Sequence, residues 1–500
     1  MINAQPDSAA RTPSFHRGIV YTSTGTIINI VALFIEAIIA ARVLSEDIYG
    51  TYVILIAVVN FLVVLIDFGC KTSVTKMLAS GDPRQQAVLA NTATVFRVLI
   101  LVALGGLLWL WKDGLLLLDP TSSYLQYAAF VPLMLATASF DELFFSMLQG
   151  FRSYAHIGIS QVIRGAVRFG LSFTFLAVFH MGILGLIYSW IVSFGISALY
   201  QFLALPISKR FVLQRPLLIE MLRFGFPLQL TRFLWFLLRR ADILLLAALA
   251  GPTSVAYYAV AARIPDALQR LSESYIAVYF PTMSSMLAQG KQALADQMLN
   301  RSMRLISMIT SLIAIGSVLF SREIITLLFS HKYEPSIAVF GILMVAFHLA
   351  FMINLFGYTL TAGGYPGRSL WANLARIGLN VVGDLAMIPP LGAIGAATAG
   401  LVSAALANPV AVWLLRRSGT AVVALPYARQ TLAVLVVAGL VLALQPLPFL
   451  FRVGIMLVFA LLSVALSSIS LDDLNLVLPE GMTKRLGALR PSREVISHGE

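Results

Sequence analysis

Long apolar runs separated by short polar connections recur along almost the whole chain of 500 residues. A helix needs about 20 mostly apolar residues to cross the hydrocarbon core of a bilayer. The pattern predicts fourteen such helices, at residues 19–43, 49–70, 87–111, 124–148, 157–179, 182–204, 224–249, 254–280, 304–329, 336–361, 370–389, 393–415, 427–445 and 451–470. We therefore predict an all-α polytopic membrane protein of about 14 transmembrane helices.

The composition supports this fold class. The chain is 59% hydrophobic and 12% charged, whereas an average soluble domain is about 25% charged. The first apolar run is longer than the core of a signal peptide, about 7–15 residues, so it is predicted to be the first spanning helix. The single cysteine, Cys70, allows no intramolecular disulfide. No group of His, Cys and carboxylate residues has metal-site spacing, so neither a metal nor a cofactor is predicted.

The distribution of Lys and Arg predicts the orientation. The net charge is +12, which in a soluble protein would suggest nucleic-acid binding. Here the basic residues lie mostly in short connections between apolar runs. With the N-terminus inside, the inside segments carry 21 Lys and Arg residues and the outside loops carry 5. By the positive-inside rule both termini are predicted to be cytoplasmic, including the polar tail 471–500, and no nucleic acid is expected.

An internal repeat is visible in the sequence. Residues 44–52 read LSEDIYGTY and residues 250–258 read AGPTSVAYY, so Ser45 matches Gly251 and Tyr52 matches Tyr258 at an offset of 206. GILG at 182–185 matches GAIG at 392–395 at an offset of 210. Two lobes with six helices each fit these offsets, and an even number gives both lobes the same orientation. The predicted parts are a cytoplasmic N-terminus 1–18, an N-lobe 19–204, a cytoplasmic linker 205–223, a C-lobe 224–415, two further helices in 416–470, and the tail 471–500.

Three stretches resemble a known family. They are AARVLSEDIYGTY at 40–52, FGFPLQLTRFLWFLLRRADILLLAALAGPTSVAYYAVAARI at 224–264, and AGGYPGRSLWANLARIGLNVVGDLAMIPPLGAIGAATAGLVSAAL at 362–406. Together they resemble the Wzx-type polysaccharide flippases of the multidrug/oligosaccharidyl-lipid/polysaccharide exporter superfamily, over about the first 415 residues. The family usually has Gly where this chain has Ser45. The resemblance implies two six-helix lobes around a central cavity, in the bacterial inner (cytoplasmic) membrane.

Charged residues inside the predicted spans are the candidate site. A charge facing lipid is costly, so each should face protein or water. Near the middle of their spans we expect six arginines but only two acids, Asp242 and Asp266, which predicts a cationic layer. The planar guanidinium group of arginine holds its N–H donors in a fixed geometry that matches the oxygens of a phosphate group. The predicted substrate-binding residues of the cavity are Arg97, Arg164, Arg168, Arg239, Arg240 and Arg263.

Other charges have structural interpretations. Arg263, Asp266, Arg270 and Glu273 step by three, four and three residues, so they form a stripe of alternating sign on one helix face. Asp242, Asp266, Arg270 and Glu273 are therefore predicted to form structural or gating ion pairs. Glu36 and Asp384 are candidates for binding a coupling ion. His348 is expected to be a packing histidine, with a proton relay as the alternative.

The resemblance implies a function. It predicts a flippase that moves undecaprenyl-diphosphate-linked oligosaccharide repeat units to the periplasmic leaflet by alternating access, for polysaccharide biosynthesis. A polysaccharide polymerase and chain-length machinery are candidate partners, beside the lipid-linked substrate and the bilayer. The alternatives are a peptidoglycan lipid precursor flippase and a cation-coupled drug exporter, which usually stops at twelve helices. The outside loops are too short for a glycosyltransferase or polymerase site, and no phosphate-binding loop is present, so a transporter rather than an enzyme is predicted.

Overall fold

The computed structural model describes residues 15–80, 83–110, 125–210, 212–444 and 447–467, and the regular structure within them is helical. The helices are α1 (Phe15–Val43), α2 (Glu46–Ile66), α3 (Cys70–Ser80), α4 (Pro83–Leu110), α5 (Leu125–Ala128), α6 (Val131–Gly150), α7 (Tyr154–Phe173), η2 (Thr174–Val178), α8 (Gly182–Ala204), α9 (Arg215–Ala288), α10 (Gln292–Leu319), α11 (Ser321–Phe329), η3 (His331–Tyr333), α12 (Ser336–Ala362), α13 (Pro366–Leu391), α14 (Ala393–Arg417), α15 (Leu425–Leu444) and α16 (Phe449–Ser467).

Thirteen helices in the described residues are long and apolar enough to cross a membrane. The difference from the predicted fourteen lies in α9, which contains both the span 224–249 and the span 254–280. The backbone of Gly251 (φ 76°, ψ 179°) interrupts α9 at the turn that the repeat predicted. The all-α membrane fold is thus confirmed, and the predicted turn is present as a break in one long helix.

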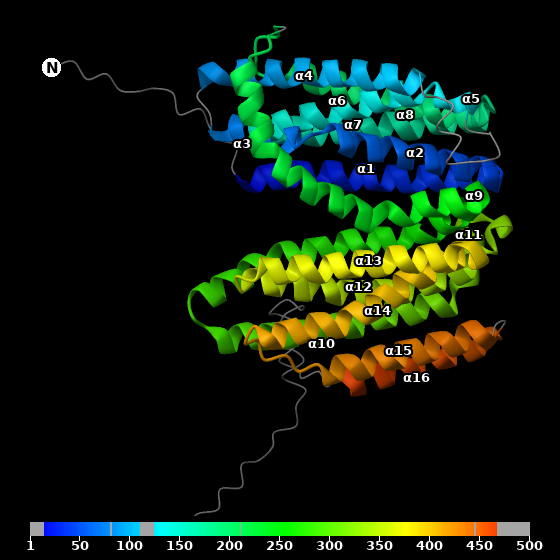
Figure 1. The fold of residues 1–500 in the computed structure, drawn as a ribbon. Coiled ribbons are helices and arrows are strands. Elements are labelled where there is room, and N and C mark those ends of the chain that lie inside the picture. The colour runs from blue at the N-terminus through cyan, green and yellow to red at the C-terminus, as the bar shows by residue number, and fades with distance from the viewer. Residues whose placement is uncertain (1–14, 81–82, 111–124, 211, 445–446, 468–500) are drawn as a thin grey trace, which may run out of the picture. The chain divides into compact units, whose positions relative to one another are not determined.

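The chain divides into two compact units. Unit 1 comprises the residues up to Val260, together with Ile325–Ser336 and Asp384–Ala396. Within it, α1 packs along α7 (Figure 1). Glycines allow this approach, because a Cβ on Gly158 would meet the backbone carbonyl of Tyr21 and one on Gly165 would lie 3.0 Å from Cα of Asn29. Small residues at such contacts let helix backbones come close in a membrane.

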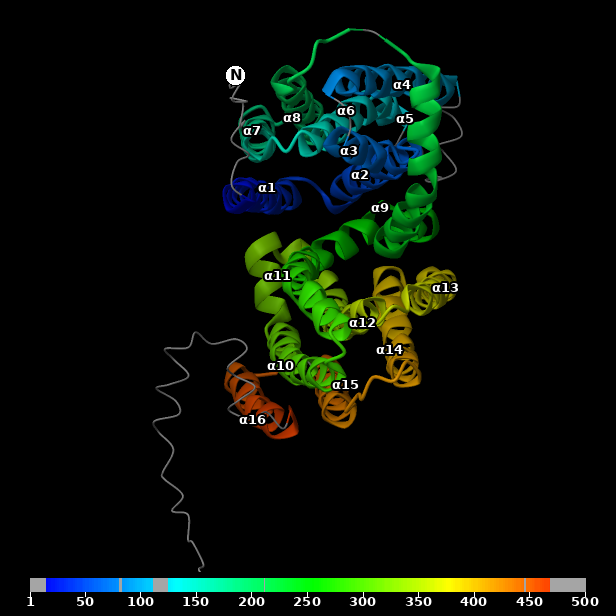
Figure 2. The same cartoon turned by 90° about the vertical axis from the view of Figure 1, so that its left-hand side faces the viewer.

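Unit 2 contains the two helices that follow the repeat. In this unit α15 and α16 lie against α10 (Figure 2). Their contact has an apolar part, which includes Ile315, Val434 and Phe459. The contact also has a buried polar part, because the Gln430 amide donates hydrogen bonds to the hydroxyl oxygens of Ser311 and Ser463, the latter at 2.6 Å. A hydrogen bond between apolar helices gives the pairing a fixed register.

His348 belongs to the packing of the same unit. It is fully buried in α12. Its Nδ1 lies 2.8 Å from the Thr310 hydroxyl of α10, and its Nε2 lies 3.2 Å from the Thr431 hydroxyl of α15. Both ring nitrogens therefore have hydrogen-bonding partners that tie three helices together.

Candidate functional site

Helix α2 is interrupted at a charged residue. It ends at Ile66, and α3 begins at Cys70 after Phe68 (φ 47°) and Gly69 (φ 78°), which both lie in the left-handed region. The sequence predicted one continuous span, 49–70. A helix that ends inside a bundle leaves carbonyl groups without intrahelical partners. Side chains from other helices meet them: Arg97 of α4 donates to the Ile66 carbonyl at 3.4 Å, and the Gln229 amide of α9 donates to that of Val64.

Helix α9 crosses this interruption in backbone contact. A Cβ on Gly69 would collide with the carbonyl oxygen of Gly225, and one on Gly225 would lie 2.5 Å from the carbonyl oxygen of Gly69. Glycine at both positions is what the packing permits. The contact brings the first part of α9 to the end of α2.

We expect Gly69→Ala to destabilise the protein strongly. The residue would need a positive φ, which costs a non-glycine residue about 1–3 kcal/mol, and its methyl group would collide with Gly225. Thermal unfolding of the purified protein in detergent measures the effect. Gly170→Ala on α7 is the matched control, because a Cβ there has no neighbour within 4 Å. Equal unfolding temperatures for the two variants would contradict the described contact.

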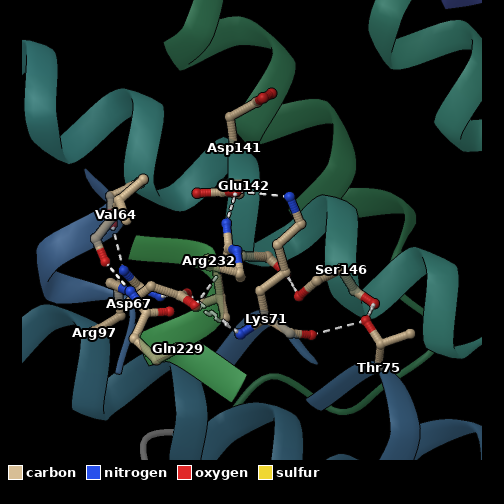
Figure 3. A network of polar contacts seen from close by, with 12 residues as sticks. Val64, Asp67, Lys71, Thr75, Arg97, Asp141, Glu142, Ser146, Gln229 and Arg232 are labelled. Atoms are coloured by element: carbon tan, nitrogen blue, oxygen red, sulfur yellow. Dashed lines mark hydrogen bonds and ion pairs between the residues drawn. The ribbon is translucent and has the colours of Figure 1, made fainter. Parts of the chain in front are cut away.

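Five charged residues form one network at the interruption, which we call the junction network: Asp67, Lys71, Arg97, Glu142 and Arg232 (Figure 3). Asp67 accepts from Arg97 at 2.8 Å through one carboxylate oxygen and from Arg232 at 2.6 Å through the other. Glu142 Oε1 accepts from Lys71 at 2.6 Å and from Arg232 at 2.8 Å. Arg232 of α9 therefore bridges carboxylates of two other elements.

The junction network has a buried part and an accessible part. The side chains of Asp67 and Arg97 are 1% and 2% exposed. Those of Lys71, Glu142 and Arg232 are 32%, 23% and 26% exposed. Three cations face two carboxylates, which leaves an excess of one positive charge on the accessible side. An anion that reached Lys71 and Arg232 would compete with Glu142 for the same donors.

A second network joins α1, α2 and α7. The Arg168 guanidinium lies 2.7 Å from a carboxylate oxygen of Glu36, and both side chains are buried, at 8% and 4% exposed. Tyr52 donates to Glu36 at 3.3 Å and accepts from Arg168 at 3.0 Å, and Ser172 donates to Glu36 at 3.2 Å. Arg168 also stacks over the ring of Trp190, 4.6 Å from its centroid. One oxygen of the buried carboxylate thus accepts from two hydroxyl groups, and the other lies in ion-pair contact with the guanidinium, which compensates the buried charge.

A third network surrounds Asp141 of α6. Its carboxylate accepts from Arg164 of α7 and from two side chains of α8, Ser197 and, at 2.9 Å, Gln201. The Asp141 side chain is 3% exposed and that of Arg164 is 18% exposed. The guanidinium of Arg164 thus covers a buried carboxylate while part of it stays accessible.

The second repeat contains a matching pair. Tyr258 donates to Asp242 at 2.7 Å across the interruption of α9. Asp242 and Tyr258 each follow Glu36 and Tyr52 by 206 positions, which is the offset of the repeat. In both repeats a tyrosine that follows the turn thus donates to a carboxylate that precedes it by 16 positions. This shared contact supports the repeat beyond the sequence matches.

The family of polysaccharide biosynthesis proteins matches residues 15–287, more than half of the chain. The chain belongs to this family. A relative, the probable flippase AglR of Haloferax volcanii, is 26% identical over 184 residues, which make up 35% of this chain and 38% of AglR. The match thus spans less than two thirds of that relative's length. The predicted resemblance to polysaccharide flippases is thus confirmed, and the family match covers the stretches 40–52 and 224–264.

Solved structures show the same fold at low sequence identity. The lipid II flippase MurJ in an inward closed conformation gives a TM-score of 0.68 at 13% identity, covering 90% of this chain and 98% of MurJ. An inward-facing multidrug resistance transporter of the MATE family, from the MOP superfamily, gives 0.64 at 14% identity, covering 80% and 99%. This polysaccharide biosynthesis protein therefore has the fold of MurJ and MATE transporters.

The structure changes the predicted cationic layer. In unit 1, Arg97, Arg164 and Arg168 each lie against a carboxylate of another helix, which are Asp67, Asp141 and Glu36 respectively. Each of these three arginines in unit 1 thus has a carboxylate partner, so the predicted excess of positive charge does not consist of three unpaired arginines there. The sequence gives the depth of a residue along its own helix only, whereas a long guanidinium side chain reaches an acid whose Cα belongs to another level or another helix.

The remaining predicted residues lie on α9 and α13. The side chain of Arg239 is outside the described part of the structure. Arg240 and Arg263 are half-buried, whereas Asp266, Arg270 and Glu273 are exposed. Asp384 is fully buried in α13. Asn380, one turn before it, accepts from Ser403 of α14 at 3.3 Å.

Sequence reasoning missed Lys71, Glu142 and Arg232 as members of the site. Lys71 directly follows the predicted span 49–70, and Arg232 and Glu142 lie within the predicted spans 224–249 and 124–148 but not among the residues expected near the middle. The signal was local: Gly69 follows Asp67 by two residues, and glycine beside a charge at the end of an apolar run indicates an interruption with unsatisfied backbone groups.

Hydrogen bonds of Arg42 and Lys332 connect the turn between α1 and α2 to the segment 327–333. We call this pair of residues the clasp. Arg42, in the last turn of α1, donates to the carbonyls of Leu328, at 2.8 Å, and Leu327. Lys332 donates in return to the carbonyls of Arg42, at 3.0 Å, and Leu44. Each cation thus binds the carbonyl end of the opposite helix, where the helix dipole favours positive charge. Burial lowers the pKa of Lys332, and the carboxylate of Glu46 opposes this shift.

The double variant Arg42→Gln with Lys332→Gln should open this clasp. We would measure labelling of Thr51→Cys, a buried position, by a water-soluble maleimide in a Cys70→Ser background. A loss of about 1–2 kcal/mol raises an open population roughly 5- to 30-fold, and the labelling rate should rise accordingly. Lys209→Gln, at an exposed residue outside the clasp, is the control. An unchanged rate in the double variant would show that the clasp does not hold the turn.

Proposed function

We propose that this protein is a flippase for undecaprenyl-diphosphate-linked oligosaccharide repeat units, which it moves from the cytoplasmic to the periplasmic leaflet by alternating access. The observation that carries the proposal is the accessible cationic excess of the junction network, in a chain of the polysaccharide biosynthesis family. AglR, a relative of part of the chain, is a probable flippase. The proposed location is the bacterial inner membrane, with both termini cytoplasmic.

The chemistry of the substrate explains why such charges would be needed. A sugar hydroxyl moved into hydrocarbon without a partner costs several kcal/mol, and a diphosphate costs more. Lys71 and Arg232 together can exchange Glu142 for a phosphate oxygen without leaving a buried cation alone. The displaced Glu142 carboxylate would stay beside the site, so the three cations would then face two carboxylates and one phosphate charge, which brings the network to electrical balance. We propose this exchange as the way the headgroup is held.

The sequence-predicted residues take two roles in this proposal. Arg164, which is partly exposed, would contact the substrate directly, and Arg239, Arg240 and Arg263 keep their proposed role as substrate-binding residues. Arg97 and Arg168, which are buried on Asp67 and Glu36, would position the neighbouring helices. Asp242, Asp266, Arg270 and Glu273 keep their proposed structural or gating role. Glu36 and Asp384 remain the proposed coupling-ion groups, Asp384 because its buried carboxylate lies one turn from Asn380.

Energy for the movement can come from the membrane. Moving one negative charge outward across an inside-negative membrane gains about 2.3 kcal/mol per 100 mV. A diphosphate headgroup that crosses while Lys71 and Arg232 stay in place would therefore be driven outward by the potential. The proposed transporter needs no nucleotide hydrolysis for this step.

Deletion of the gene in its host tests the assignment against its alternatives. We expect loss of one surface glycan and accumulation of its lipid-linked repeat unit on the cytoplasmic side, with growth preserved when glycan synthesis is also blocked. Accumulation of the peptidoglycan lipid precursor would instead indicate the first alternative. Increased sensitivity to cationic drugs with an intact surface glycan would indicate the exporter.

A further inference from the structure

Helix α10 carries a polar face at its first turns. It begins at Gln292, well before residue 304, where its apolar run starts. Gln297, Asn300, Arg301 and Arg304 are spaced by three, one and three residues, so they share one side of the helix. Leu299 and Met303 on other sides are buried. The polar face therefore lies on the first turns of α10, directly before its apolar run begins at residue 304.

A cavity of about 360 Å³ lies on this face. Its other wall is the connection between α14 and α15, at Ala421 and Val423. Asn300 fixes that wall in place, because its amide donates to the Ala421 carbonyl at 2.7 Å and accepts from the Val423 N–H at 2.8 Å. Arg416 of α14 donates to the Val422 carbonyl at 3.3 Å. The cavity is thus held open by hydrogen bonds from two helices.

The charges of the cavity favour an anion. Arg301 and Arg304 are half-buried in its wall. Asp296 is the one acid among the lining residues, and its carboxylate accepts from Gln292 at 2.9 Å. A guanidinium has five N–H donors, so a protein partner does not exhaust it. The guanidinium groups of two arginines one turn apart can both donate hydrogen bonds to the oxygens of one phosphate group.

We propose that this cavity binds a phosphate group, carried by an anionic lipid headgroup or present as free phosphate. The cavity lies where the apolar run of α10 begins, which is the level of lipid headgroups. With the proposed orientation this is the cytoplasmic leaflet, whose surface is negatively charged. The site shares no residue with the junction network, so it can be tested independently of the substrate route.

Thermal unfolding of the full chain in a neutral detergent tests the proposal. The probes are inorganic phosphate, short-chain phosphatidylglycerol and short-chain phosphatidylcholine. We expect phosphatidylglycerol, inorganic phosphate or both to raise the unfolding temperature of the wild type, and phosphatidylcholine to do so less. A response to phosphatidylglycerol alone identifies the headgroup as the ligand, and a response to inorganic phosphate identifies the free anion.

Charge-matched variants locate the site. Arg301→Gln with Arg304→Gln should weaken the apparent affinity roughly tenfold or more, because two charge-assisted contacts are lost. Lys291→Gln with Arg429→Gln removes the same charge at exposed positions outside the cavity and should leave the affinity unchanged. Arg304→Lys keeps the positive charge but removes the bidentate contact of the guanidinium with phosphate, so it should also weaken binding. This variant tests the site if the double variant does not fold. The proposal is overturned if the wild type responds to neither anionic probe, or if Arg304→Lys and the double variant respond like the control.

Discussion

Arg168→Met is expected to lower the free energy of unfolding by roughly 3–5 kcal/mol, because it leaves the buried carboxylate of Glu36 without its cation. The hydroxyl groups of Tyr52 and Ser172 would remain as its hydrogen-bond donors in this network. The substitution also removes the contact of the guanidinium with the ring of Trp190. Chemical unfolding of the purified protein in detergent measures the difference.

A double variant separates loss of the ion pair from loss of packing. Glu36→Gln with Arg168→Met removes both charges, so it should recover most of the stability that Arg168→Met loses. Arg210→Met, at an exposed residue, should stay within about 0.5 kcal/mol of the wild type. If Arg168→Met unfolds like Arg210→Met, the described pair of Glu36 and Arg168 does not contribute to the fold.

Lys71→Gln and Arg232→Gln should each reduce transport of the lipid-linked substrate by tenfold or more while the protein stays folded. A hydrogen bond to a charged group contributes about 1.5–3 kcal/mol, and each 1.4 kcal/mol corresponds to a factor of ten. Because these side chains are 32% and 26% exposed, their loss should affect folding less than loss of Arg168. Surface glycan in a complemented deletion strain measures transport.

Lys76→Gln is the matched control for this experiment. Lys76 lies on the same helix, α3, and is exposed. Its ammonium group lies over the ring of Phe224 and outside the junction network. We expect this variant to restore the surface glycan to the level of the wild type. Normal glycan levels with both Lys71→Gln and Arg232→Gln, at equal protein abundance, would remove the junction network from the proposed substrate route.

The spans of the fold were predictable because apolar runs of bilayer length determine them directly. The turns of the repeat were predictable as well, since Ser45 and Gly251 mark equivalent positions, and the structure interrupts the helices there. The interruption after Asp67 was not predicted. Hydropathy averages over a window, and one carboxylate followed by Phe68 and Gly69 changes that average little, although it ends the helix.

The partners of the arginines could not be predicted from one sequence. Arg97 and Asp67 are 30 positions apart, and Arg168 and Glu36 are 132 apart, so no helical spacing relates them. Only the packing of α4 on the end of α2, and of α7 on α1, brings them together. The repeat did contain usable information, because Glu36 and Asp242 occupy equivalent positions and both accept from a tyrosine.

Translocation by the purified protein tests the central claim most directly. Proteoliposomes would contain a radiolabelled undecaprenyl-diphosphate-linked oligosaccharide, and a glycosidase added outside would report arrival of the glycan in the outer leaflet. We predict faster exposure of the glycan with the wild type than in protein-free vesicles, and a rate reduced at least about tenfold in the Lys71→Gln, Arg232→Gln double variant. A wild-type rate equal to that of protein-free vesicles would contradict the account.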